Sequence, residues 1–112
     1  MNKIIHLLCL LEGCDRRKMD DRKELVKVLN RAAYRSNMTI LKTSWAEFKP
    51  QGLSIILLLA ESHIAIHTWP ELEKVDLEIV SCAANSNPLD GLKEITSYLK
   101  PKRIKKKIIN FI

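Results

Sequence analysis

The sequence predicts an α+β fold, a two-layer sandwich in which two helices pack on one face of a mostly antiparallel sheet. The first observation is the order of patterned segments, which reads strand, helix, three or four strands, helix and strand. The second is size, because 112 residues build one compact core and are too few for two. The third is composition: 46% hydrophobic and 29% charged residues are typical of a folded domain and argue against disorder. We therefore expect a single domain over residues 1–112.

The N-terminal third predicts a buried strand followed by a helix. Residues 3–11 are rich in Ile and Leu, as in buried strands, and residues 13–20 form a polar connection. Asp21, with Glu24 three residues later, resembles a capping box and begins a helix over residues 21–36. The apolar positions of this helix fall on one face, at Leu25, Val28, Leu29, Ala32 and Ala33.

The middle of the chain predicts consecutive strands. They cover residues 39–48, 53–60, 62–68 and about 75–82. Pro50-Gln51-Gly52 supplies the turn between the first two. In the third strand His63 and His67 share one face. Trp69-Pro70 ends that strand, because proline cannot continue a central ladder.

The C-terminal third predicts a helix and a last strand. Asn87-Pro88 supplies an N-cap and a first-turn proline. The helix that follows carries its apolar residues at Leu92, Ile95 and Leu99, and Pro101 marks its end. Residues 103–111 then offer the last strand.

The net charge of +6 and a pI near 9.4 raise nucleic acid as a partner. Much of the positive charge lies in the lysine-rich stretch 100–107. No aromatic residues interleave with this stretch, so a stacking platform for single strands is absent. Lysines on an edge strand also prevent edge-to-edge aggregation. Nucleic-acid binding is therefore an unlikely main function.

The cysteines and the apolar runs indicate the compartment. Cys9, Cys14 and Cys82 form no Cys-x-x-Cys pair, and an odd number of cysteines without a secretion signal predicts reduced thiols. No apolar run approaches the roughly 18 residues that a membrane span needs. We expect a cytoplasmic protein without a membrane segment.

Residues 59–71 are the most informative stretch of the chain. They place Ser62, two histidines and two glutamates in a segment that otherwise reads as a core strand. Polar and titratable groups inside an apolar strand are costly unless a function retains them. Taken singly, these residues have simpler explanations: a serine such as Ser62 often begins a strand, and a lone histidine such as His67 is often structural. A zinc site built from His63, His67 and Cys82 lacks the usual ligand spacing, so we expect no metal.

The run from Glu61 to Glu71 closely resembles the prokaryotic S-adenosylmethionine decarboxylases, a pyruvoyl-dependent and self-processing family. The resemblance extends upstream through residues 48–54, which match the family's Phe-x-Pro-x-Gly-x-Ser, and downstream to Cys82. It also covers residues 6–15 and 31–34, so most of the chain takes part. The central motif is long and chemically unusual, which makes the resemblance specific.

The resemblance implies that the chain cuts itself between Glu61 and Ser62, into residues 1–61 and 62–112. The Ser62 hydroxyl would attack the Glu61 carbonyl, and an N-to-O acyl shift would turn the amide into an ester. Elimination and hydrolysis would then leave a pyruvoyl group in place of Ser62. A serine suits this chemistry because it supplies both a nucleophile and a leaving oxygen.

The resemblance assigns two further residues to processing. His67 would assist the elimination as a base, which suits the near-neutral pKa of an unperturbed histidine. Ser54 would hydrogen-bond the cyclic intermediate. His63 matches no catalytic position and is expected to be structural.

The resemblance also implies the residues of turnover. The pyruvoyl group would accept electrons from the substrate, so that no pyridoxal phosphate is needed. Cys82 would donate the proton to the resulting carbanion as a thiol. Glu71 would bind the ribose hydroxyls, and Phe48 and Trp69 would stack on adenine. A homodimer with active sites near its interface is implied as well, and decarboxylated S-adenosylmethionine would serve as aminopropyl donor for spermidine.

The stretch 72–78 departs from the family pattern, which usually continues with Tyr-Gly-Tyr and small residues. Ala83 also stands where glycine usually follows the cysteine. These departures keep a pyruvoyl-dependent arginine or ornithine decarboxylase open as an alternative. A non-catalytic homologue and a basic nucleic-acid-binding domain are the alternatives from other functional classes.

Overall fold

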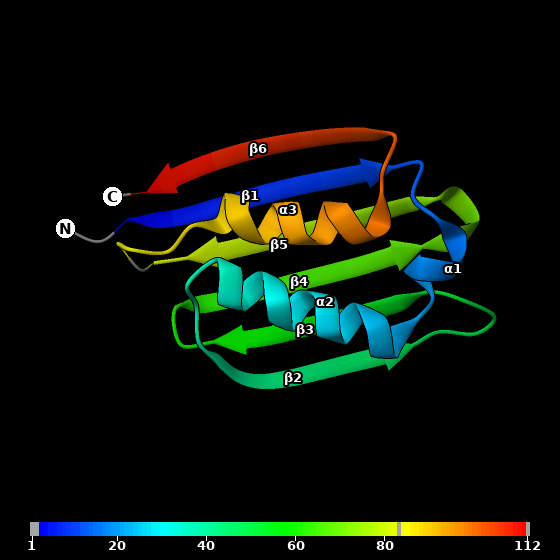
Figure 1. Ribbon diagram of the computed structural model, residues 1–112, viewed down its shortest axis with the longest axis horizontal. Helices are drawn as coiled ribbons and strands as arrows, with labels where there is room; N and C mark the ends of the chain where they lie inside the picture. Colours follow the sequence, from blue (N-terminus) through cyan, green and yellow to red (C-terminus); the bar gives the residue numbers. More distant parts are fainter. Residues whose placement is uncertain (1–2, 83, 112) are drawn as a thin grey trace.

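The computed structural model describes residues 3–82 and 84–111, and residues 1, 2, 83 and 112 lie outside its described part. Over these ranges the chain forms one six-stranded sheet with helices on one face, as predicted (Figure 1). The elements in chain order are β1 (Ile4–Glu12), α1 (Arg16–Met19), α2 (Arg22–Arg35), β2 (Ile40–Glu47), β3 (Leu53–Leu59), β4 (Ser62–Trp69), the 3-10 helix η1 (Pro70–Leu72), β5 (Lys74–Ser81), α3 (Pro88–Leu99) and β6 (Arg103–Phe111).

The strand order across the sheet is β2-β3-β4-β5-β1-β6. Every neighbouring pair in this order is antiparallel. β4 lies inside the sheet between β3 and β5, so its side chains meet partners on both sides. Figure 1 shows the turn between β3 and β4 at the same end of the sheet as both termini, with α1 at the opposite end.

α2 and α3 cover one face of the sheet and enclose the core (Figure 1). α2 begins after Asp21, whose carboxylate accepts the Glu24 backbone N–H at 3.2 Å, as the capping pattern predicted. The fully buried large side chains come from both layers: Leu7, Leu11, Met19, Leu25, Leu29, Ile55, Leu57, Ile64, Ile66, Leu77, Ile79 and Ile95. This packing buries the alternate residues of each inner strand, which holds the register in place.

One local expectation is wrong, and another is confirmed in position but differs in its hydrogen bonding. Residues 13–20 are not merely a polar connection, because α1 lies within them and its N-cap Asp15 accepts from the backbone N–H groups of Arg17 and Lys18. A four-residue helix is too short to show helical periodicity in a sequence. Asn87 occupies the N-cap position of α3, but its side chain donates to Asp90 instead of accepting a helix N–H.

The opposite face of the sheet is open in the described chain, where none of the helices covers it (Figure 1). It carries apolar side chains on β3, where Ile56 is 45% and Leu58 is 50% exposed. It also carries His63 and His67 on β4, because the alternate residues Ile64 and Ile66 are buried toward the helices. We call this surface the open face. Within the described residues, no helix combines the length and apolar character that crossing a bilayer requires.

Candidate active site

The candidate residues divide between the two ends of β4. At the serine end lie Glu61, Ser62, His63, Glu78 and Cys82. At the pocket end lie Phe48, Ser54, His67, Trp69 and Glu71. His67 follows Ser62 by five positions of extended strand, which corresponds to roughly 16 Å at 3.3 Å per residue. The structure therefore groups the predicted residues into two sets and keeps the sets apart within one chain.

Ser62 has a strained backbone. It follows the two-residue connection Ala60-Glu61 between β3 and β4, with Leu59 and Ser62 paired across the hairpin. Its φ is 147°, a value that glycine adopts readily and that other residues rarely adopt. Conformations of this kind cost on the order of 1–3 kcal/mol and persist where the surrounding structure enforces them. The predicted scissile bond thus lies at a strained position.

Glu61 is fixed by two backbone donors. Its carbonyl oxygen accepts the Cys82 N–H at 3.0 Å, and its carboxylate accepts the Thr39 N–H at 2.9 Å. Cys82 directly follows β5 and is exposed. The structure therefore brings Cys82 beside the Glu61–Ser62 bond, where a proton donor for chemistry at position 62 would have to lie.

His63 lies between Ser62 and a carboxylate. Its Nδ1 is 3.4 Å from Ser62 Oγ, and its Nε2 is 3.1 Å from Glu78 Oε1 on β5. The sequence offered no sign of this arrangement, because Glu78 belongs to a different strand and the register between β4 and β5 cannot be read from the chain. His63 was expected to be structural, and the geometry places it in contact with the predicted nucleophile.

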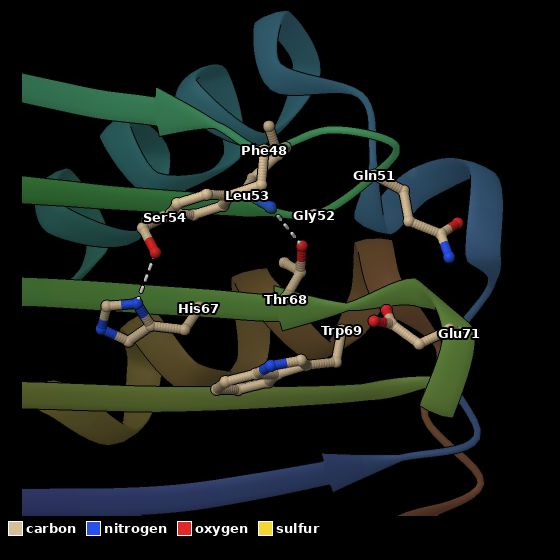
Figure 2. Close-up of a pocket in the computed structure, with 9 residues that line it drawn as sticks. All are labelled: Phe48, Gln51, Gly52, Leu53, Ser54, His67, Thr68, Trp69 and Glu71. Atoms are coloured by element: carbon tan, nitrogen blue, oxygen red, sulfur yellow. Dashed lines mark hydrogen bonds between the residues drawn. The ribbon is translucent and has the colours of Figure 1, made fainter.

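At the pocket end, Ser54 and His67 face each other across β3 and β4. Their side chains form a hydrogen bond of 2.6 Å between Ser54 Oγ and His67 Nδ1 (Figure 2). The register places the two residues directly opposite, which the sequence could not specify. His67 also lies near Trp69, with ring centroids 6.4 Å apart.

These residues line a pocket of about 320 Å³. Its complete lining is Phe48, Gln51, Gly52, Leu53, Ser54, His67, Thr68, Trp69 and Glu71. Figure 2 shows the Phe48 ring over β3 and the Trp69 ring on the other side of β4. Both rings are accessible, with Phe48 53% and Trp69 42% exposed. Glu71 is exposed on η1, which follows β4 directly.

The connection from β2 to β3 shapes the pocket. The Phe48 N–H donates to the Gly52 carbonyl at 2.9 Å. The Leu53 N–H donates to Thr68 Oγ1 at 2.9 Å (Figure 2). Gly52 has a φ of 106°, and a Cβ there would lie 3.2 Å from the Thr68 carbonyl oxygen. A glycine is therefore required where this turn meets β4. Gln51, Gly52, Leu53 and Thr68 were not predicted as lining residues, although the turn signal at residues 50–52 was visible.

The cysteines differ in accessibility. Cys9 and Cys14 are buried, as expected, and burial raises the pKa of each thiol to about 11. Cys82 is exposed at the serine end. Over residues 3–82 and 84–111, no group of three or more His, Cys, Asp or Glu side chains is arranged to hold a metal ion.

Comparisons with known proteins agree on one family. The sequence profile of the S-adenosylmethionine decarboxylase family matches residues 5–110. An S-adenosylmethionine decarboxylase proenzyme of Methanococcus maripaludis is 35% identical over 99 residues, which cover 88% of this chain and 81% of that protein. A proenzyme of the same name from Caldanaerobacter subterraneus is 35% identical over 95 residues, covering 85% of this chain and 77% of that protein. The crystal structure of the adenosylmethionine decarboxylase from Aquifex aeolicus is 32% identical, with a TM-score of 0.89 over 96% of this chain and 89% of that one.

Proposed function

We propose that this chain, which belongs to the S-adenosylmethionine decarboxylase family, is a proenzyme that cuts itself between Glu61 and Ser62 and then decarboxylates S-adenosylmethionine. The observation that carries the proposal is the geometry of the Glu61–Ser62 peptide bond. Its serine has a strained φ, and its carbonyl oxygen accepts the Cys82 N–H. A bond that is both strained and polarised is prepared for attack by the neighbouring hydroxyl.

The proposed processing converts Ser62 into a pyruvoyl group. Ser62 Oγ attacks the Glu61 carbonyl carbon, and the acyl group moves from nitrogen to oxygen. A base then removes the Ser62 Cα proton, the Cβ–O bond breaks and Glu61 leaves as a carboxylate. The dehydroalanine that remains hydrolyses to pyruvoyl with loss of ammonia, at the start of the chain 62–112. A pyruvoyl group supplies an electron-accepting carbonyl for decarboxylation.

The pocket end fits the substrate proposed from the family. Two accessible aromatic rings, Phe48 and Trp69, can hold an adenine by stacking. The Glu71 carboxylate can accept hydrogen bonds from two neighbouring ribose hydroxyls. A carboxylate also favours a cationic sulfonium substrate in a protein whose net charge is +6.

We further propose that two copies of the chain complete each site. In one chain His67 is roughly 16 Å from Ser62, too far to remove its Cα proton. Packing of two open faces about a two-fold axis would place His67 and Ser54 of one copy against Ser62 and Cys82 of the other. The exposed Ile56 and Leu58 on that face would then be buried, as expected for a symmetric dimer.

The proposed location is the cytoplasm. Cys82 must stay a free thiol to donate its proton, and thiols persist in reducing compartments. The product, decarboxylated S-adenosylmethionine, would serve there as the aminopropyl donor for spermidine synthesis.

Co-expression of two inactive variants tests the shared site. Ser62→Ala lacks the nucleophile and His67→Ala lacks the base, so neither should yield the fragments 1–61 and 62–112 alone. In a mixed dimer, Ser62 of the His67→Ala chain meets an intact His67 of its partner. With differently tagged chains, mass spectrometry should therefore show cleavage of the His67→Ala chain only. Absence of cleavage in purified mixed dimers would place both residues in one chain and refute the shared site.

The substrate is tested on the processed wild type. Carbon dioxide release should occur with S-adenosylmethionine and not with arginine or ornithine offered separately. Turnover confined to either amino acid would overturn the substrate while leaving self-cleavage intact.

A further inference from the structure

We propose that His63 is the base that starts self-cleavage and that Glu78 positions it. The proposal rests on the proposed self-processing of this chain and names the group that performs its first step. His63 would act within its own chain, before the distant His67 is needed for the elimination.

The contacts of His63 define which of its ring nitrogens is unprotonated. A carboxylate can only accept, so the contact of 3.1 Å between Glu78 Oε1 and Nε2 places the proton on Nε2. Nδ1 then carries a lone pair and lies 3.4 Å from Ser62 Oγ. That distance is long for a hydrogen bond, and such contacts shorten when the reacting geometry forms. Serine, histidine and carboxylate thus stand in the order that activates a hydroxyl.

A third group contacts the bond that reacts. The Cys82 N–H donates at 3.0 Å to the Glu61 carbonyl oxygen, which is the oxygen that becomes negative when Ser62 attacks. A donor already directed at that oxygen stabilises the developing charge. Nucleophile, base and donor therefore converge on one peptide bond, and its serine is strained.

The proposed step balances without any other reactant. The Ser62 hydroxyl proton passes to His63 Nδ1 as Oγ bonds to the Glu61 carbonyl carbon. The carbonyl oxygen becomes an oxyanion next to the Cys82 N–H, while Glu78 stabilises the imidazolium. The carbon–nitrogen bond then breaks as the Nδ1 proton passes to the Ser62 nitrogen. The products are an ester and a free amine, and His63 returns to its neutral form.

The rival explanation is that His63 and Glu78 form only a cross-strand pair. Their side chains are 37% and 38% exposed, and half-exposed pairs contribute little to the stability of a fold. A structural pair would not explain why the free nitrogen faces the nucleophile. It also predicts that loss of the imidazole leaves the cleavage rate unchanged.

The test follows cleavage of freshly translated full-length chain by mass spectrometry, with hydroxylamine added to detect ester. His63→Ala should slow cleavage about 100-fold or more, the usual contribution of a general base. It should accumulate as the intact amide, which hydroxylamine does not cut, and added imidazole should restore part of the rate. His67→Ala should instead accumulate as the ester, which hydroxylamine cuts. His6→Ala removes a histidine of the same open face that lies on β1 instead of β4; it is the matched control and should cleave normally.

The carboxylate is tested separately. Glu78→Gln should slow the same step by about tenfold or more because it no longer fixes the Nε2–H tautomer. Glu78→Asp should recover part of the rate. Glu47→Gln is the control, since Glu47 pairs with Arg22 and lies on the edge strand β2, which neighbours β3 and not β4.

Each outcome decides the proposal. A wild-type cleavage rate in His63→Ala would overturn it, as would accumulation of ester in that variant. If His63→Ala does not fold, the rate of Glu78→Gln decides alone. A wild-type chain that never cleaves would overturn the proposed self-processing itself. A wild-type chain and a His63 variant that cleave equally well would overturn only the role of His63.

Discussion

The two ends of β4 place a histidine on the same open face but give it different partners. At the serine end, His63 contacts a carboxylate on β5 and the Ser62 hydroxyl. At the pocket end, His67 pairs with the Ser54 hydroxyl on β3. A carboxylate can only accept a hydrogen bond, so it fixes which imidazole nitrogen is unprotonated. A hydroxyl can donate or accept, so it does not fix the tautomer. We infer that the tautomer of His63 is fixed for one proton transfer, whereas the tautomer of His67 depends on groups other than Ser54.

The surroundings of the two ends differ as well. The serine end is a tight turn in which backbone donors hold Glu61, so its groups are placed beside the peptide bond of the proposed self-cleavage. The pocket end is a concavity with two accessible rings and an exposed carboxylate, so its groups suit a ligand. Under the roles proposed above, β4 holds self-cleavage and substrate recognition five positions apart, and this separation is the reason we propose that a second copy completes each site.

The largest expected effect is at the serine end. Ser62→Ala removes the nucleophile and should leave one intact chain of 112 residues, because no other hydroxyl lies on the scissile bond. Electrophoresis and intact mass after long incubation at neutral pH measure this. Ser54→Ala is the comparison at the other end and should slow cleavage without abolishing it. Fragments 1–61 and 62–112 in Ser62→Ala would show that the bond breaks by another route.

Cys82→Ala should separate the two reactions that share the serine end. The substitution keeps the backbone N–H on the Glu61 carbonyl, so cleavage should proceed normally. It removes the thiol, so decarboxylation should fall by about 100-fold or more, the usual cost of losing a general acid. Mass spectrometry measures the first reaction and carbon dioxide release the second. Full turnover in Cys82→Ala would pass the proton-donor role to another group.

Most of the fold could be predicted because hydrophobic periodicity reports burial directly. Ile64 and Ile66 alternate with His63 and His67, and the structure buries the first pair and leaves the second on the open face. α1 escaped prediction because four residues show no period.

The site could be predicted only residue by residue. The family resemblance carried by the run from Glu61 to Glu71 implied the roles of Ser62 and Cys82. Contacts across strands depend on register, which the sequence does not state. The sequence therefore predicts a structural His63 and gives no sign of the contact of 3.1 Å between His63 Nε2 and Glu78 Oε1. The separation of Ser62 from His67, in contrast, follows from their five-residue spacing in an extended strand.

A smaller effect is expected at the pocket end. Glu71→Gln should leave cleavage unchanged and lower kcat/KM for S-adenosylmethionine, because the amide is a weaker partner for ribose hydroxyls. Loss of a charged hydrogen-bond partner costs on the order of 1.5–3 kcal/mol, or about tenfold to 100-fold in kcat/KM. Carbon dioxide release at several substrate concentrations measures it. Glu73→Gln, which changes a neighbouring carboxylate paired with Arg16, should behave as wild type. Slow cleavage in Glu71→Gln would contradict the division between the two ends.

The smallest expected effect is a difference in thiol reactivity on the processed enzyme. Cys82 is exposed and should take one equivalent of iodoacetamide at pH 8, with loss of decarboxylation. Cys9 and Cys14 should react only after unfolding, because burial blocks access and raises the pKa of each thiol to about 11, so both stay protonated at that pH. Peptide mapping after labelling, with and without guanidinium, reads all three sites, and Cys82→Ala should take no label while folded. Labelling of Cys9 or Cys14 in the folded enzyme to the same extent as Cys82 would mean that the core opens readily. Loss of activity on alkylation could then no longer be assigned to the Cys82 thiol.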